Sequence, residues 1–118
     1  MNKQVAEFQK TAEERWQFFK NKEIQKGNRR EEKLRRIARD LYEKNELEEL
    51  EVLLDDPNDA VRMCAAAKLV VIGNAKAEET LEELSKKTIA YRGDITAEIS
   101  FCSEMVLKVW RMGTYVPW

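Results

Sequence analysis

Apolar residues recur every three or four positions along most of the chain, the spacing that places side chains on one helix face. The pattern predicts a first helix over residues 3–25, which Gly27 is expected to separate from a second. Asn28 and Asn45, each followed three residues later by a glutamate, are typical of helix starts with a capping box. The inward positions of the first three helices are expected at Val5, Phe8, Ala12, Trp16, Phe19, Leu34, Ile37, Ala38, Leu41, Tyr42, Leu47, Leu50, Leu53 and Leu54.

The second half of the chain predicts three more helices. Asp56 is expected to cap the fourth, with Pro57 in its first turn and Gly73 just after its end. Asn74 is expected to cap the fifth helix, and Gly93 and Asp94 separate it from the sixth. Buried positions are expected at Val61, Ala65, Leu69, Ile72, Ala77, Leu81, Leu84, Thr88, Ile95, Ile99, Cys102, Val106 and Val109. Because no segment alternates apolar and polar residues, the predicted fold class is all-α.

Composition agrees with a single helical domain. Only four Gly and two Pro interrupt 118 residues, and charged residues make up 36%, against about 25% in a typical soluble domain. No apolar run approaches the roughly 18–20 residues of a membrane span, and the first residues lack the apolar segment of a signal peptide. Cys64 and Cys102 form no CxxC motif and suit a reducing compartment, so we expect a cytoplasmic protein without membrane contact.

Residue types that carry catalysis are scarce. The chain has no histidine, which removes the usual general base and most zinc sites. It has no GxGxxG or GxxxxGK motif for a nucleotide, and its glutamate clusters lack EF-hand spacing. Cys64 and Cys102 are interpreted as small core side chains. We therefore expect no enzyme, no catalytic residue, no cofactor and no metal.

A weak internal repeat links the fourth and sixth helices. A shift of 38 residues places Asp56 on Asp94 and Cys64 on Cys102, and a period near 40 is typical of paired-helix repeats. The segment from Leu53 to Leu69 carries an Asp-Pro turn, a Val-Arg pair and three consecutive alanines. It resembles the HEAT repeat pattern, well over residues 46–73 and only weakly over 75–113.

The resemblance implies a short α-α superhelical stack of about six helices. In it, residues 1–44 cover one end, 46–73 and 75–113 form HEAT-like helix pairs, and 114–118 form an irregular tail. In HEAT units an Asp-Arg pair links turn to helix, so Asp56 and Arg62 are expected to be structural. Tyr115 and Trp118 are expected to cap the last helix pair, with anchoring of a partner as the alternative.

Charge is balanced overall but not along the chain. Residues 20–39 hold nine basic and three acidic side chains, whereas residues 43–59 hold eight acidic and one basic. Solvated helix faces account for such runs in many proteins, and helix starts favour carboxylates. A functional acidic surface would meet a basic protein, and a functional basic surface would meet phosphates. Glu31 and Glu32 interrupt the basic run at spacings that pair with Arg35 and Arg36, which weakens the second interpretation.

Helical repeat stacks present extended surfaces to macromolecules, so the leading expectation is a non-enzymatic protein-binding module. By analogy, compact single-domain HEAT-like proteins look like immunity proteins that block a cognate bacterial toxin, here possibly a basic nuclease. The expected partner-binding residues are Glu46, Glu48, Glu49, Asp55, Asp59, Glu78, Glu79, Glu82 and Glu83. The alternative is a nucleic-acid-binding HEAT-like protein that uses Lys26, Arg29, Arg30, Lys33, Arg36 and Arg39.

Overall fold

The computed structural model describes residues 2–87 and 95–118, with the backbone alone for 95–97. This part of the chain contains helices and no strand, so the predicted all-α class is confirmed. The elements are α1 (Lys3–Lys20), α2 (Ile24–Glu43), the 3-10 helix η1 (Leu47–Asp55), α3 (Asp59–Leu69), the 3-10 helix η2 (Val70–Ile72), α4 (Ala75–Ser85) and α5 (Ile95–Arg111).

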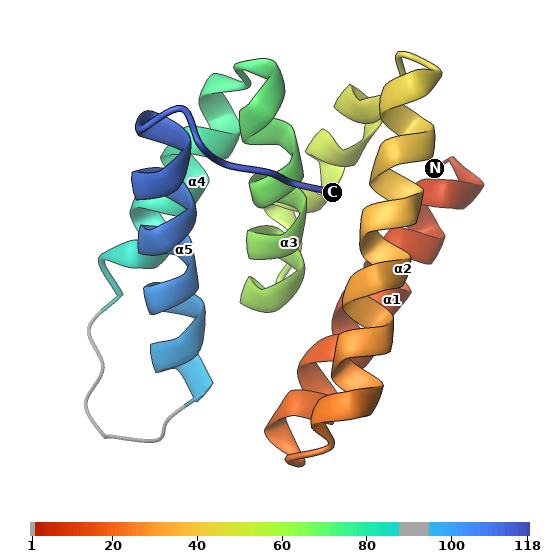
Figure 1. Cartoon of the computed structure of the whole chain (residues 1–118), viewed down its shortest axis with the longest axis vertical. Helices are drawn as coiled ribbons and strands as arrows, with labels where there is room; N and C mark the ends of the chain where they lie inside the picture. The colour runs from red at the N-terminus through yellow and green to blue at the C-terminus, as the bar shows by residue number, and fades with distance from the viewer. Residues whose placement is uncertain (1, 88–94) are drawn as a thin grey trace.

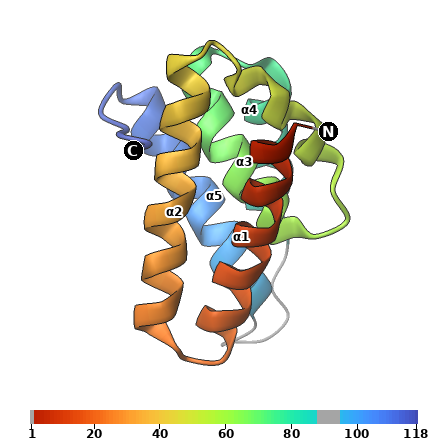
Figure 2. The same cartoon turned by 90° about the vertical axis from the view of Figure 1, so that its right-hand side faces the viewer.

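The longer helices and η1 alternate in direction along the chain (Figure 1). The α1–α2 hairpin forms one side, α3 lies in the middle, and α4 and α5 form the other side. Figure 2 shows α1 and α2 side by side, with α3 and α5 behind them. Each successive pair is in close contact: α1 with α2, η1 with α3, and α4 with α5.

The core is centred on α3, which contacts η1, α1, α4 and α5. Its small side chains at Ala60, Ala65 and Ala66 are fully buried and let the surrounding helices approach closely. Leucines from η1, α2 and α4 fill the space around it, and truncation of such a side chain typically costs about 2–5 kcal/mol. The fully buried leucines are Leu34, Leu41, Leu50, Leu53, Leu54, Leu69, Leu81 and Leu84, all predicted from the apolar pattern.

The joint between the first two helices differs from the prediction. The turn lies at residues 21–23, where Lys22 adopts a positive φ of 63°, so Gly27 and Asn28 are inside α2. Gly27 is buried, and a Cβ atom there would lie 2.4 Å from Cε1 of Phe19. The prediction of a helix break was wrong because this glycine permits close packing of two helices instead.

Two predicted helix caps are also wrong. Asn45 adopts a left-handed φ of 58° after α2, and no side chain caps η1. Asn58 caps α3 by accepting a hydrogen bond from the Ala60 amide at 2.9 Å, while Asp56 accepts one from the Asn58 amide in the preceding turn. The predictions at the next boundary are confirmed: Gly73 is left-handed, and Asn74 accepts a hydrogen bond from the Ala77 amide.

The inner line of α5 lies one position away from the predicted one. Ile99, Ser103 and Leu107 are buried, whereas Cys102, Val106 and Val109 are only half-buried. The Ser103 hydroxyl donates to the Ile99 carbonyl at 2.7 Å, which satisfies a polar group that the apolar pattern does not reveal. Elsewhere Ile72 is half-buried and Tyr42 is exposed. The predictions at Thr88, Gly93, Asp94 and the Ile95 side chain lie outside the described residues.

The aromatic side chains on the helix stripes lie at the edge of the core. Trp16 and Trp110 are half-buried and pack against it. The tail, residues 114–118, folds back, but it crosses from α5 over α3 to α2 and does not cover the end of the last helix pair (Figure 1). There the Trp118 ring lies 5.0 Å from the ring of Tyr42, measured between centroids.

Candidate functional site

The predicted acidic segment forms the outer side of η1. Leu47, Leu50 and Leu53 recur every three residues and are buried, which matches the three-residue period of a 3-10 helix. The residues between them consequently face solvent: Glu48, Glu49, Glu51 and Val52. Val52 is 55% exposed, so an apolar side chain lies among these carboxylates.

The carboxylates of η1 have no cationic partner within ion-pair distance among residues 2–87 and 95–118, except for Asp55. Glu46, next to η1, and Glu49 accept hydrogen bonds from the neutral side-chain amide of Asn2, at 3.5 and 3.1 Å. Glu51 accepts one from the amide of Asn74 at 3.0 Å. The negative charge of this segment is therefore not compensated by nearby lysines or arginines in the described structure. We call Glu46, Glu48, Glu49, Glu51 and Val52 the η1 face.

Most of the other predicted acidic residues form ion pairs within the chain. Asp55 binds Lys76 at 2.9 Å, and both Glu78 and Glu82 bind Arg111. These pairs link η1 to α4 and α4 to α5, so they stabilise the packing of neighbouring elements. Glu79 is exposed on α4. The residues whose charge is used inside the fold are Asp55, Asp59, Glu78, Glu82 and Glu83.

Arg62 connects α3 to its surroundings, although not through the predicted Asp56. Its guanidinium donates to the Leu54 carbonyl at 3.0 Å, to Asp59 at 3.2 Å and to Glu83 at 2.9 Å. Asp56 instead accepts a hydrogen bond from Gln9 of α1. Burial alone would raise the pKa of Asp59, but hydrogen bonds from Lys87 and Arg62 outweigh it and lower this pKa below its usual value. The predicted structural role of Arg62 thus runs through other residues.

The predicted basic residues lie along α2, and half of them pair with carboxylates. Lys26 binds Glu23 at 3.1 Å, while Arg30 and Lys33 bind carboxylates of α1 at 3.3 and 3.1 Å. Lys26 and Arg30 also lie over the half-buried ring of Phe18. The remaining three are exposed, with no carboxylate within 4 Å in the described part of the chain: Arg29, Arg36 and Arg39.

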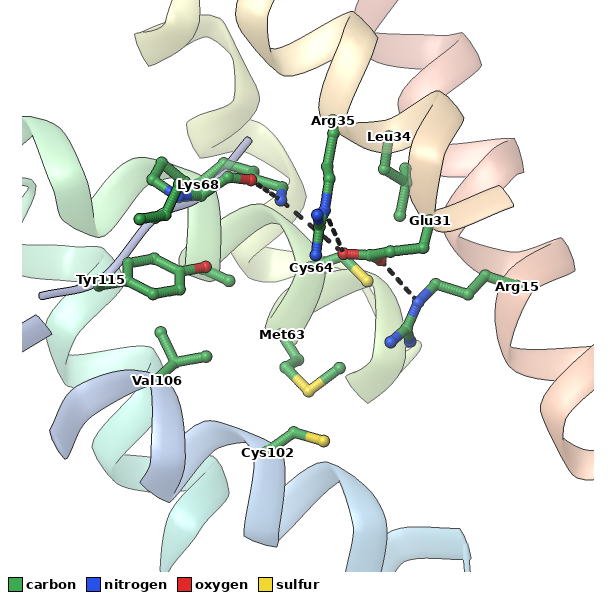
Figure 3. A pocket seen from close by; sticks show the side chains of 13 residues that line it. Arg15, Glu31, Leu34, Arg35, Met63, Cys64, Lys68, Cys102, Val106 and Tyr115 are labelled. Carbon is green, nitrogen blue, oxygen red and sulfur yellow. Dashed lines mark hydrogen bonds and ion pairs between the residues drawn. The ribbon is translucent and has the colours of Figure 1, made fainter. Parts of the chain in front are cut away.

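A charged pocket that the sequence analysis missed lies between α1, α2, α3, α5 and the tail, with a volume of about 220 Å³. Figure 3 shows Glu31 among three cations. One Glu31 oxygen lies 2.8 Å from Arg15 Nε, and the other lies 3.4 Å from Arg35 Nε and 4.0 Å from Lys68 Nζ. Lys68 is 4% exposed, and its Nζ donates a hydrogen bond to the Pro117 carbonyl of the tail.

Burial controls the ionisation of the groups in this pocket. It lowers the pKa of Lys68, and it raises the pKa of the Cys64 thiol to about 11. The pKa values of Cys102 and Tyr115 are raised for the same reason. Both thiols are therefore protonated near neutral pH, which leaves little thiolate for nucleophilic chemistry.

A local signal for this pocket does exist in α3. Lys68 falls on the same helix line as Val61 and Cys64, so a lysine stands where the pattern calls for an apolar side chain. Its partners cannot be found in this way, because Arg15, Glu31 and Arg35 come from two other helices.

Two further properties concern ions and membranes. Within residues 2–87 and 95–118, no three Cys, Asp or Glu side chains are placed to hold a metal ion together. None of the helices described here has both the length and the apolar character that a membrane span requires.

Comparison with known proteins places the chain in a family. No curated protein and no solved structure matches it. A family model described as a domain of unknown function, DUF2019, matches residues 2–100, which include α1 to α4 and the start of α5. Since this match spans most of the 118 residues, the chain belongs to the DUF2019 family.

Proposed function

We propose that this chain is a non-enzymatic module that binds a basic protein through the η1 face. The observation that carries the proposal is the uncompensated charge of this face, in contrast to the ion-paired carboxylates around it. Four carboxylates close together repel one another, and a basic partner would relieve that repulsion. Such complementarity speeds association and selects the partner more than it adds raw affinity.

Apolar surface next to the η1 face supplies a second element of a protein interface. Val52 is exposed among the carboxylates, and a shallow hollow of about 240 Å³ opens beside Glu48. Tyr42, Leu47 and Ile72 line that hollow. An apolar contact surrounded by charged residues is the usual anatomy of a protein-binding surface.

The more specific proposal is an immunity protein with a HEAT-like stack, acting in the bacterial cytoplasm against a cognate toxin. The alternating helix pairs and the alanine-rich α3 support the HEAT-like part. For a toxin that is a basic nuclease, the carboxylates of the η1 face would occupy the positions of substrate phosphates. This assignment rests on analogy with small helical immunity proteins.

The test compares capture of a partner from the producing cell by the tagged wild-type chain and by Glu48→Lys/Glu49→Lys. The matched control is Glu13→Lys/Glu104→Lys, which makes the same change in net charge at exposed positions of α1 and α5. We expect a basic protein to be captured by the wild type and the control but lost with the η1 variant. Equal capture by all three chains would refute the role of the η1 face.

The immunity assignment has its own test. The captured protein, expressed alone, should stop growth, and coexpression of wild-type chain but not of Glu48→Lys/Glu49→Lys should restore it. A captured protein without any effect on growth would refute the toxin assignment and leave the binding surface in place.

Nucleic-acid binding is the alternative, favoured by the three unpaired arginines of α2. Arg29, Arg36 and Arg39 are exposed, but Glu32 and Asp40 lie on the same helix surface. A titration of random duplex and single strands at rising salt decides the question. Binding that weakens steeply with salt and is lost in Arg29→Gln/Arg36→Gln would favour this alternative.

A further inference from the structure

The pocket between α2, α3 and α5 holds more positive than negative charge. Arg15, Arg35 and Lys68 face the single carboxylate of Glu31, and these are the charged residues that line it. The side chains of Arg15 and Lys68 are only 17% and 5% exposed, so water compensates their charges poorly. Buried cations of this kind are costly unless an anion satisfies them.

Glu31 does not satisfy these cations fully. Arg15 Nε is buried and lies 2.8 Å from a Glu31 oxygen, yet it makes no hydrogen bond because the two groups are not aligned. Lys68 lies 4.0 Å from the other oxygen, and the hydrogen bond that it makes is to a neutral carbonyl, that of Pro117. The pocket therefore has donor capacity for a second anionic group.

The rest of the lining is apolar and limits the size of an occupant. Leu34, Met63 and Val106 line the same space as the charged groups. An apolar cavity of about 150 Å³ is large enough to bind benzene. The volume here, about 220 Å³, fits one ring or a short branched chain with a carboxylate attached.

We infer that this pocket binds a small organic carboxylate with a compact apolar body. The carboxylate accepts hydrogen bonds from Arg15 and Lys68, and the apolar body packs against Met63 and Val106 beneath the tail. Tyr115, Val116 and Pro117 of the tail form one wall of the pocket. The inference is independent of the η1 face, since none of the residues of that face lines this pocket.

The test is a titration of the ¹⁵N-labelled chain with benzoate, followed by backbone amide shifts. Benzamide is the matched neutral probe, because it has the same ring and size without the charge. We expect saturable shifts of pocket residues with benzoate, at a Kd of about 1 mM or tighter, and much weaker binding of benzamide.

Variants identify the groups that hold the anion. Lys68→Met keeps the side-chain length and should weaken benzoate binding about tenfold or more, since a hydrogen bond to a charged group is lost. Arg15→Gln should have a similar effect, and it keeps the test decisive if Lys68→Met does not fold. Arg29→Met, which removes an exposed cation outside the pocket, should leave benzoate binding unchanged.

Three results would overturn the inference. The first is the absence of any saturable shift with benzoate. The second is equal affinity for benzoate and benzamide, which would mean that the cavity takes apolar molecules without regard to charge. The third is binding of inorganic phosphate alone, which would mean that the apolar part of the lining contributes nothing.

Discussion

The ring of Phe19, near the end of α1, lies against the backbone of Gly27 in α2. A Cβ atom at position 27 would approach Cε1 of this ring to 2.4 Å and Cδ1 to 2.6 Å. Glycine in a helix normally costs about 0.5–1 kcal/mol relative to alanine. Here that cost is offset by the close contact of the two helices.

This contact predicts that Gly27→Ala changes sign with residue 19. In the wild-type background the added methyl displaces the ring, and we expect the free energy of unfolding to fall by about 1 kcal/mol. In the Phe19→Ala background the same substitution should raise it by about 0.5–1 kcal/mol, because helix propensity then dominates. Urea denaturation of the four chains measures this cycle, and equal effects in both backgrounds would refute the steric explanation.

The ion pairs of Asp59 predict a pH-dependent contribution to stability. The pKa of Asp59 is lower in the folded chain than its usual 3.8, so its contribution is present above pH 3.8. It is lost as the pH falls through the folded-state pKa. Asp59→Asn should therefore lower the free energy of unfolding by about 1 kcal/mol at pH 7, and the two chains should converge in acid.

The control for this prediction is Glu79→Gln, at an exposed position of α4 for which the structure shows no ion pair. It should leave stability unchanged across the same pH range. If Asp59→Asn is as stable as wild type at pH 7 but weakens partner capture, Asp59 belongs to the binding surface and our assignment of it to the fold is wrong.

The two cysteines are expected to differ in reactivity. Burial raises the pKa of the Cys64 thiol to about 11 and places it out of solvent, whereas Cys102 is half-buried. Iodoacetamide at neutral pH should modify Cys102 first, and Cys64 only when urea unfolds the chain. Mass spectrometry of a labelling time course gives both rates, and early modification of Cys64 in native buffer would contradict the packing described for α3.

The core was predictable because the apolar pattern and the helix period coincide. Leu50, Leu53, Leu81 and Leu84 are buried as the spacing indicates, since each segment can hide only one face. Helix boundaries were less predictable, because glycine and asparagine each have more than one structural use. Gly27 allows close packing and Asn45 adopts a left-handed turn, and neither use differs from a helix stop or start in the sequence.

The sites were predictable only in part. The acidic run of η1 is visible as a local excess of glutamate, but its division into paired and unpaired carboxylates depends on distant residues such as Lys76 and Arg111. The central pocket brings together Arg15, Glu31 and Lys68 from three helices. Tertiary packing creates this cluster, and no local pattern along the chain reports it.

The most direct test of the proposed function is site-specific photo-crosslinking in the producing cell. A photoreactive phenylalanine analogue replaces Val52 in the centre of the η1 face or, as a control of comparable exposure, Phe101 on α5. We predict one discrete protein adduct from position 52 that disappears in the Glu48→Lys/Glu49→Lys chain, and none of it from position 101. An adduct that forms equally from both positions, or none from position 52, would contradict binding through the η1 face.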